Sequence, residues 1–267
     1  MRPVDSSSAS SDDALFVSRR RFLAASVGIP LLASRTGSAS ANTNTPVAAP
    51  TVPAPKVTKS KPGQKTEAAS FIQHGARTSR HVALTFHGAG SAALANQVLA
   101  LTKRLKTPVT VFAVGNWVDA NPELAKAFRA AGHELGNHTY SHPALRRLGR
   151  AAVATEISGA ATALNRATGS IGAWFRPSGT PTPSALMLEE AAKVGYETVV
   201  GYDVDPRDYQ DPGSKLVVSR TTAGIQGGSI VSLHLGHQGT VDALEAIISA
   251  IRARGLEPAT VSTVLHD

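Results

Sequence analysis

The chain has 267 residues, a length that suits one large domain with additional segments. It contains 27 basic residues, 19 acidic residues and no cysteine, which excludes disulfides and thiolate metal sites. From residue 66 onward there are 18 basic and 16 acidic residues, so most of the net charge of +8 lies in the N-terminal segments. Because no basic helix or aromatic-interleaved stripe follows residue 66, we expect no nucleic-acid partner.

Residues 1–41 have the order of features that an export signal requires. Arg19 and Arg20 precede a broken apolar run, and the small-x-small triplet Ala39-Ser40-Ala41 follows it. This order resembles a twin-arginine signal peptide and implies a secreted or cell-wall-associated protein. The apolar run is too short and too interrupted to form a stable membrane anchor.

Residues 42–65 consist largely of Thr, Pro, Ala and Lys and have almost no large apolar side chain. A segment of this composition cannot bury enough surface to offset its ordering entropy, and it is predicted to be a disordered linker. The predicted organisation is therefore a signal peptide at 1–41, a linker at 42–65 and one domain at 66–267, which we expect to be monomeric.

From residue 81 onward, short apolar segments alternate with helical patterns. The expected strands are residues 81–86, 109–114, 134–137, 173–175, 197–202 and 229–234. The expected helices are residues 92–106, 122–131, 151–167, 184–194, 215–225 and 240–255. This alternation predicts an α/β fold with a parallel sheet covered by helices. In α/β folds with parallel strands, active groups gather at the C-terminal ends of the strands. At or just after the expected strand ends lie His87, His138, Arg176, Asp205 and His234.

The segment Gly-Asn-His-Thr-Tyr-Ser-His-Pro at residues 136–143 places His138 and His142 four residues apart. On one helical turn these side chains would share a face and could offer two neutral nitrogens to a single divalent cation. The alternative is a pair of surface histidines with no ligand.

With this segment, residues 109–145 resemble the polysaccharide deacetylase family, also called the NodB-homology domain or carbohydrate esterase family 4. The resemblance extends over residues 70–265. It implies a distorted (β/α) barrel of about seven parallel strands, and a metal, expected to be zinc, held by Asp, His and His. It also implies a reaction that removes acetyl groups from N-acetylated polysaccharides.

The chain departs from the first motif of that family, Thr-Phe-Asp-Asp-Gly, in which one Asp is the base and the next a metal ligand. Here the matching residues from Thr85 to Ala89 contain His87 and Gly88 in place of both carboxylates. An imidazole can act as a base near neutral pH, and it can also complete a metal site. We expect His87 to bind the metal with His138 and His142, with the base role as the alternative.

The remaining motifs are matched in part, and their roles are those that the resemblance implies. Arg176, in Arg176-Pro177-Ser178, matches the Arg-x-Pro pattern of the family only in part and would orient an acidic partner or the base. His234 would be the general acid. The segment 205–209 resembles Asp-x-x-Asp-Trp with Tyr209 in place of Trp, and Asp205 or Asp208 would accept a proton. The expected substrate contacts are Tyr209, Trp174 and Leu233.

The predicted function is a metal-dependent hydrolase that deacetylates a cell-wall peptidoglycan or chitin-like glycan. The alternative is a non-catalytic carbohydrate-binding pseudo-deacetylase at the cell wall. Arg176 and His234 favour the enzyme, whereas the carboxylate missing at Gly88 favours the binder.

Overall fold

The computed structural model describes residues 67–267, so the predicted signal peptide and linker lie outside the described residues. The strands are β1 (Ser70–Ile72), β2 (His81–Gly88), β3 (Thr110–Ala113), β4 (Glu134–Asn137), β5 (Thr198–Val200), β6 (Ile230–His234) and β7 (Glu257–Ala259). The helices are α1 (Ala92–Arg104), α2 (Gly115–Ala120), α3 (Pro122–Ala130), α4 (Arg150–Thr168), α5 (Ala185–Val194), α6 (Ser214–Gly224), α7 (Gln238–Ala253) and α8 (Val261–Leu265). Two short 3₁₀ helices are η1 (Leu145–Arg147) and η2 (Asp208–Gln210).

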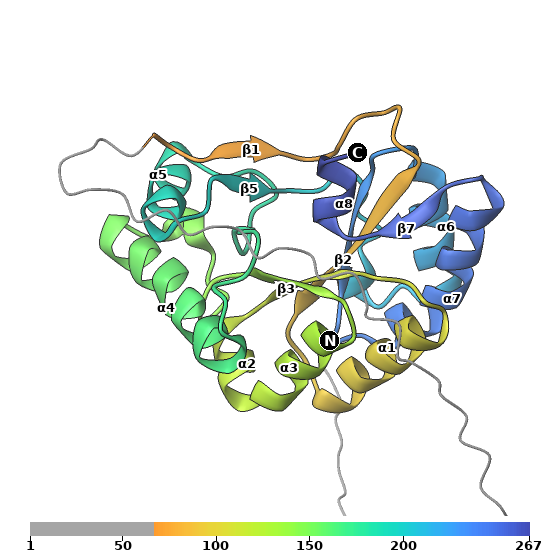
Figure 1. Cartoon of the computed structure of the whole chain (residues 1–267), viewed down its shortest axis with the longest axis horizontal. Coiled ribbons are helices and arrows are strands. Elements are labelled where there is room, and N and C mark those ends of the chain that lie inside the picture. The colour runs from red at the N-terminus through yellow and green to blue at the C-terminus, as the bar shows by residue number, and fades with distance from the viewer. Residues whose placement is uncertain (1–66) are drawn as a thin grey trace, which may run out of the picture. The chain divides into compact units, whose positions relative to one another are not determined.

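Strand β2 lies at the centre of the sheet (Figure 1). The order is β4-β3-β2-β6, with β7 also paired to β2, and β1 pairs with β5; every one of these pairs is parallel. Single parallel bridges join Asn137 to Phe175, Phe175 to Val199, and Val204 to Val231. The predicted α/β fold with parallel strands is confirmed, and the bridges are consistent with a distorted barrel.

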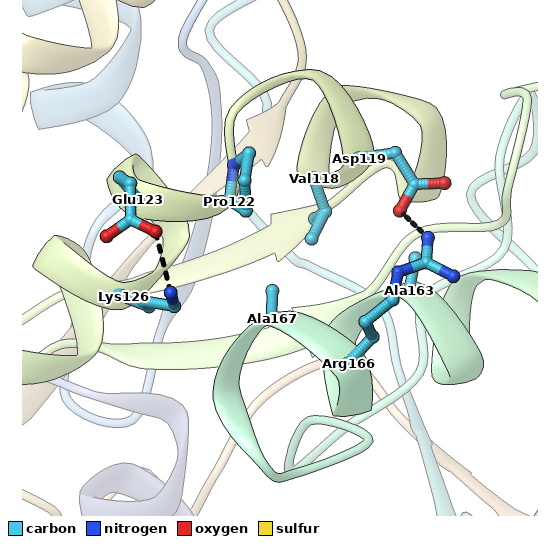
Figure 2. A pocket seen from close by; sticks show the side chains of 8 residues that line it. All are labelled: Val118, Asp119, Pro122, Glu123, Lys126, Ala163, Arg166 and Ala167. Carbon is cyan, nitrogen blue, oxygen red and sulfur yellow. Dashed lines mark hydrogen bonds and ion pairs between the residues drawn. The ribbon is translucent and has the colours of Figure 1, made fainter.

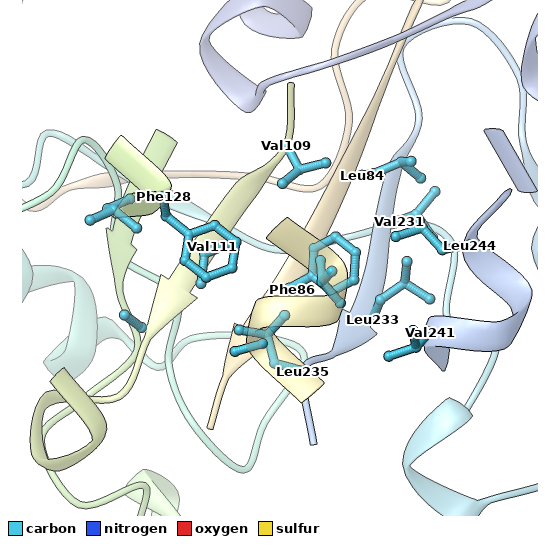
Figure 3. Close-up of a cluster of buried hydrophobic side chains, with 14 of the residues drawn as sticks. Leu84, Phe86, Val109, Val111, Phe128, Val231, Leu233, Leu235, Val241 and Leu244 are labelled. Atoms are coloured by element: carbon cyan, nitrogen blue, oxygen red, sulfur yellow. The ribbon is translucent and has the colours of Figure 1, made fainter. Parts of the chain in front are cut away.

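Side chains along β2 alternate between two faces of the strand. Leu84 and Phe86 point into the main hydrophobic cluster, where they meet residues of β3, β6, α3 and α7 (Figure 3). Full burial of a side chain such as Phe86 contributes about 1.5–3 kcal/mol to stability. Thr85 and His87 occupy the other face of the strand, where both contact Arg176. The period of two therefore turns His87 away from the helices.

Several predicted elements differ from the structure. Strands β1 and β7 and helices α2 and α8 were not expected, and the expected strand at 173–175 is reduced to the bridge at Phe175. The predicted helical turn from His138 to His142 is wrong, because this segment is a loop in which Thr139 and His142 take the left-handed conformation, with φ of 67° and 59°. In residues 67–267, no helix has both the length and the apolar character of a membrane span.

Candidate active site

His87 is the next-to-last residue of β2, and His234 is the last residue of the neighbouring strand β6. Parallel pairing of β2 and β6 places these residues opposite each other, and His87 Nδ1 lies 2.9 Å from His234 Nε2. His87 also stacks on His138, with ring centroids 4.3 Å apart. The sheet register thus brings together three histidines that are far apart in the sequence.

Arg176 is a buried cation with a relative exposure of 1%. Its guanidinium donates to the carbonyls of Val200 (3.0 Å) and Gly201 (2.8 Å) and to Thr85 Oγ1 (2.8 Å). It also lies 3.9 Å from the centroid of the Phe112 ring. Burial lowers the pKa of Arg176 to about 9.

The expected pairing of Arg176 with a carboxylate is not observed, since none of the ion pairs between described residues includes it. Its partner is His87, whose Nε2 lies 3.2 Å from Arg176 Nη1. This contact fits the other role expected for Arg176, orientation of the candidate base, which stays a prediction.

The hydrogen bonds fix the tautomers of both strand-end histidines. A guanidinium has only donors, so His87 Nε2 must accept and its Nδ1 carries the proton. His87 Nδ1 then donates to His234 Nε2, and His234 Nδ1 donates to Asp208 Oδ1 at 2.7 Å. Burial lowers the pKa of His87 well below its ordinary value of 6.5, with smaller effects from neighbouring histidines and Arg176.

Asp208 is almost completely buried, with a relative exposure of 1%, and is saturated with donors. Besides the His234 ring, it accepts from the backbone N–H of His234 (2.7 Å), the backbone N–H of Tyr209 (3.0 Å) and Thr240 Oγ1 (2.6 Å). Asp205, in contrast, accepts from the backbone of Arg207 at 2.8 Å. Of the two aspartates, the structure therefore places Asp208 against the histidines.

His138 provides the best evidence for a cation site. Its Nδ1 lies 2.8 Å from the carbonyl oxygen of Arg176 and must donate to it, which leaves Nε2 as an acceptor. That Nε2 is buried and has no hydrogen-bond partner. The ring of His142 lies edge-on to it, with centroids 4.9 Å apart. An unpartnered buried imidazole nitrogen beside a second imidazole fits a divalent cation.

A complete ligand set is not assembled around this pair. Within residues 67–267, no three His, Asp or Glu side chains are arranged to hold a metal ion. Both ring nitrogens of His87 already have hydrogen-bond partners, so binding a metal would require one of these bonds to be exchanged. The assignment of His87 as a third ligand stays a prediction.

Gly88 allows a close approach of β2 to β3. A Cβ atom at this position would lie 2.9 Å from both Ala113 Cα and Val111 Cγ1, which is closer than real Cβ atoms approach. The alternation of the strand also turns position 88 away from the face that carries His87. A carboxylate at position 88 would therefore need a different strand geometry to reach the histidines.

The three expected substrate contacts lie in different surroundings. Tyr209 is 45% exposed, and its ring centroid is 5.3 Å from that of His234. Leu233 is fully buried in the main hydrophobic cluster, and Trp174 packs in the cluster around α8. Only Tyr209 is placed beside the histidines with a face open to a ligand.

Sequence reasoning missed Thr85, Thr240 and Glu156. The two threonines hold Arg176 and Asp208, and Glu156 on α4 accepts from the backbone of Tyr140 and Ser141. Thr85 lies inside a recognised motif and could have been found, whereas neither Thr240 nor Glu156 has a local signal.

A surface hollow between α2, α3 and α4 does not coincide with the histidines (Figure 2). It is lined by Val118, Asp119, Pro122, Glu123, Lys126, Ala163, Arg166 and Ala167. Its charged side chains are paired, because Arg166 forms an ion pair with Asp119 and Lys126 forms an ion pair with Glu123. Nothing in this lining indicates a ligand.

Known proteins are similar to this chain in sequence and in fold. The profile of the polysaccharide deacetylase family matches residues 74–199. A chitooligosaccharide deacetylase of Bradyrhizobium sp. (strain ANU 289) is 34% identical over 201 residues, which are 67% of this chain and 88% of the relative. A peptidoglycan-N-acetylglucosamine deacetylase of Bacillus cereus is 31% identical over 195 residues, which are 69% of this chain and 88% of the relative.

Solved structures agree with these matches. A peptidoglycan N-acetylglucosamine deacetylase in complex with a benzamide superposes with a TM-score of 0.69 at 26% identity, covering 74% of this chain and 94% of that chain. A mutant of a carbohydrate esterase family 4 pseudoenzyme, with restored enzymatic activity, has the same TM-score at 25% identity and covers 74% and 72%. The chain belongs to the polysaccharide deacetylase family.

Proposed function

We propose that this protein is a metal-dependent hydrolase that removes acetyl groups from N-acetylated glycans such as peptidoglycan or chitin. The observation that carries the proposal is the buried, unpartnered Nε2 of His138 beside His142. The names of the relatives, which are chitooligosaccharide and peptidoglycan deacetylases, support this class of substrate.

A divalent cation, proposed to be zinc, would be held by His138 and His142. When bound, such a cation supplies a Lewis acid that polarises the acetamide carbonyl. Thiolate ligands are excluded, since the chain contains no cysteine.

Proton transfer is assigned to the histidines at the strand ends. Asp208 fixes the His234 ring through its Nδ1–H, so Nε2 is the nitrogen that exchanges a proton with the departing amine. His87 Nδ1 donates a hydrogen bond to that same Nε2. Because both ring nitrogens of His87 are hydrogen-bonded, a proton-transfer role for His87 is favoured over a role as metal ligand. Tyr209 supplies an exposed aromatic face for a sugar ring.

The test combines metal analysis with acetate release. We expect the purified protein to bind zinc and to release acetate from N-acetylated chitooligosaccharides or peptidoglycan. Replacement of His138 or His142 by Ala should lower zinc content strongly and abolish acetate release, while the exposed His74→Ala control keeps both. Wild-type protein that binds no zinc and releases no acetate would rule out this function.

A second candidate is a non-catalytic glycan-binding domain. The observation that favours it is that no three His, Asp or Glu side chains within residues 67–267 are arranged to hold a metal ion, together with the likeness to a mutant of a pseudoenzyme. This candidate predicts retention of the protein on insoluble peptidoglycan or chitin without acetate release.

We also propose that the protein acts outside the cytoplasm and is exported by the twin-arginine route. Support comes from the order of Arg19, Arg20 and the Ala39-Ser40-Ala41 triplet in the sequence. Relatives named peptidoglycan deacetylases act on a polymer of the cell wall, which agrees with this location.

A further inference from the structure

The loop that connects His138 to His142 has an unfavourable backbone. Thr139 and His142 have φ of 67° and 59°, a region that non-glycine residues rarely occupy and that a β-branched residue such as Thr occupies least readily. Such conformations persist only where surrounding contacts over-determine them. The spacing of the two imidazoles therefore depends on the groups that hold this loop.

Part of the support comes from the neighbouring backbone. Asn137 Oδ1 accepts from the N–H of Thr139 at 2.9 Å. The carbonyls of Thr139 and Tyr140 accept from the N–H groups of Gly115 and Asn116, both at 2.9 Å. These contacts leave the N–H groups of Tyr140 and Ser141, midway between the two histidines, without a backbone acceptor.

A single carboxylate on α4 takes both of these N–H groups. Glu156 Oε2 accepts from Tyr140 N at 2.9 Å and from Ser141 N at 2.8 Å, and Oε1 accepts from Ser141 Oγ at 2.6 Å. Hydrogen bonds to an ionised acceptor are stronger than neutral ones. Glu156 thus ties the two central residues of the loop to a long helix that packs against the sheet.

The side chain of Tyr140 adds a second attachment on the same side of the loop. Its hydroxyl donates to Asp119 Oδ2 at 3.1 Å, and Asp119 is held in turn by Arg166 of α4 (Figure 2). This attachment is at the tip of an exposed ring, whereas Glu156 bonds the backbone itself.

We propose that Glu156 is a positioning residue that holds His142 in place relative to His138 and thereby sets the affinity of the pair for a divalent cation. The inference rests on the proposed function, in which these two histidines bind the cation. None of the hydrogen bonds of Glu156 involves an imidazole, so it acts through the loop backbone.

Two substitutions of Glu156 distinguish its effect on the position of the loop from the effect of its negative charge. Glu156→Ala removes all three acceptor contacts. Glu156→Gln removes the negative charge but keeps a carbonyl oxygen for the two N–H groups and an amide group that can donate to Ser141 Oγ. Glu123→Gln is the matched control, because it removes the same charge from an exposed helix position whose side chain, among the described residues, hydrogen-bonds only Lys126.

Zinc affinity is measured by calorimetry on the folded full chain, and exchange of the Tyr140 and Ser141 amides is followed by NMR. We expect Glu156→Ala to weaken zinc binding by about 10–100-fold, as loss of a residue that supports metal ligands does. The exchange of the two amides should become faster. Glu156→Gln should stay close to wild type in both measurements, and Glu123→Gln should match wild type.

Unchanged zinc affinity in Glu156→Ala would overturn the inference and leave the proposed function intact. An equal loss in Glu156→Gln would also overturn it, because the effect would then come from charge and not from position. If wild-type protein binds no zinc, the proposed function fails, and unchanged amide exchange in Glu156→Ala would in addition show that Glu156 does not position the loop.

Discussion

At the scale of single residues, the chemistry of His87 depends on partners that the sequence does not show. Its place at the end of a strand follows from the apolar pattern before it, and the structure puts it there. Its two nitrogens, however, are assigned by Arg176 and His234, which are 89 and 147 residues away in the chain. A family motif predicts which position is functional, but the hydrogen bonds at that position arise only in the folded protein.

Substitution of His87 separates the two roles predicted for it. His87→Ala should retain zinc on His138 and His142 while acetate release falls by about 10²–10⁴-fold, the usual contribution of a general acid–base group. His87→Gln should also lose rate, because an amide can replace both hydrogen bonds but cannot transfer the proton. Zinc content and acetate release are measured on the same samples.

The outcome that contradicts this prediction is loss of zinc together with activity in both His87 variants. His87 would then be the third ligand, and the bond to Arg176 or to His234 would have to be exchanged when the cation enters. His74→Ala, which replaces an exposed histidine in the isolated bridge to Ser229, controls for the loss of an imidazole as such.

At the scale of elements, periodicity predicts the long helices and the central strands, because each buries a regular apolar face. Helix α7, with Val241, Leu244, Ile247, Ile248 and Ile251 buried, is the clearest case. Strands β1 and β7 have three residues each and α8 has five, too few to establish a period. The loop after β4 could not be predicted either, since its conformation depends on Asn137 and on the distant Glu156.

His133 connects three elements in the core. Its Nδ1 accepts from the N–H of Val109 before β3, and its Nε2 lies 3.1 Å from Thr102 Oγ1 on α1. Because Thr102 Oγ1 donates to the carbonyl of Val98 at 2.8 Å, His133 Nε2 is the donor, and the ring is neutral. Burial lowers the pKa of His133 from 6.5 to about 4.

This shift makes His133 a source of acid sensitivity. Above the ordinary pKa the ring is neutral in the folded and in the unfolded chain, so it has no effect on the pH dependence. Between that value and pH 4 only the unfolded chain binds the proton, and the free energy of unfolding falls by about 3 kcal/mol. His133→Gln should therefore lose less stability than wild type between pH 7 and pH 4.5, as measured by urea unfolding.

For His133, the quantity to compare is the slope of the free energy of unfolding against pH. Absolute stabilities are not compared, because Gln also changes the packing beside Phe128. His74→Ala again serves as the control and should leave the slope unchanged, since this histidine is exposed. Equal slopes for wild type and His133→Gln would show that His133 takes up its proton at an ordinary pKa in the folded protein.

At the scale of the whole molecule, the sequence divides the chain by charge and composition. The N-terminal segments carry most of the excess of basic residues, while the domain is close to neutral. That division predicts an α/β domain that begins near residue 66, because the composition of residues 42–65 is typical of a linker, and this boundary stays a prediction. The fold class followed from the alternation of elements, as the comparisons and the structure confirm.

Export is tested by the double substitution Arg19→Lys and Arg20→Lys. A receptor recognises the paired arginines themselves and not their positive charge. Lys at both positions should therefore block export although the net charge is unchanged. The measurement is the distribution of protein between cells and medium or cell wall, and a Lys56→Arg variant in the predicted linker is the control. Unchanged secretion of the double variant would exclude the twin-arginine route.

The one-way hydrogen bonds from Arg176 through His87 and His234 to Asp208 have an electrostatic consequence. Arg176 and Asp208 are opposite charges, each with a relative exposure of 1%, and within residues 67–267 neither forms an ion pair with a Lys, Arg, Asp or Glu side chain. In this hydrogen-bonded arrangement the two imidazoles between them are neutral. The site therefore contains two opposite charges that are connected only through the hydrogen bonds of two polarisable rings. Because each ring is polarised in the same sense, the guanidinium stabilises the carboxylate at a distance. Charge balance at this site is thus a property of four residues together, and replacement of either terminal charge leaves the other one buried without its counterpart.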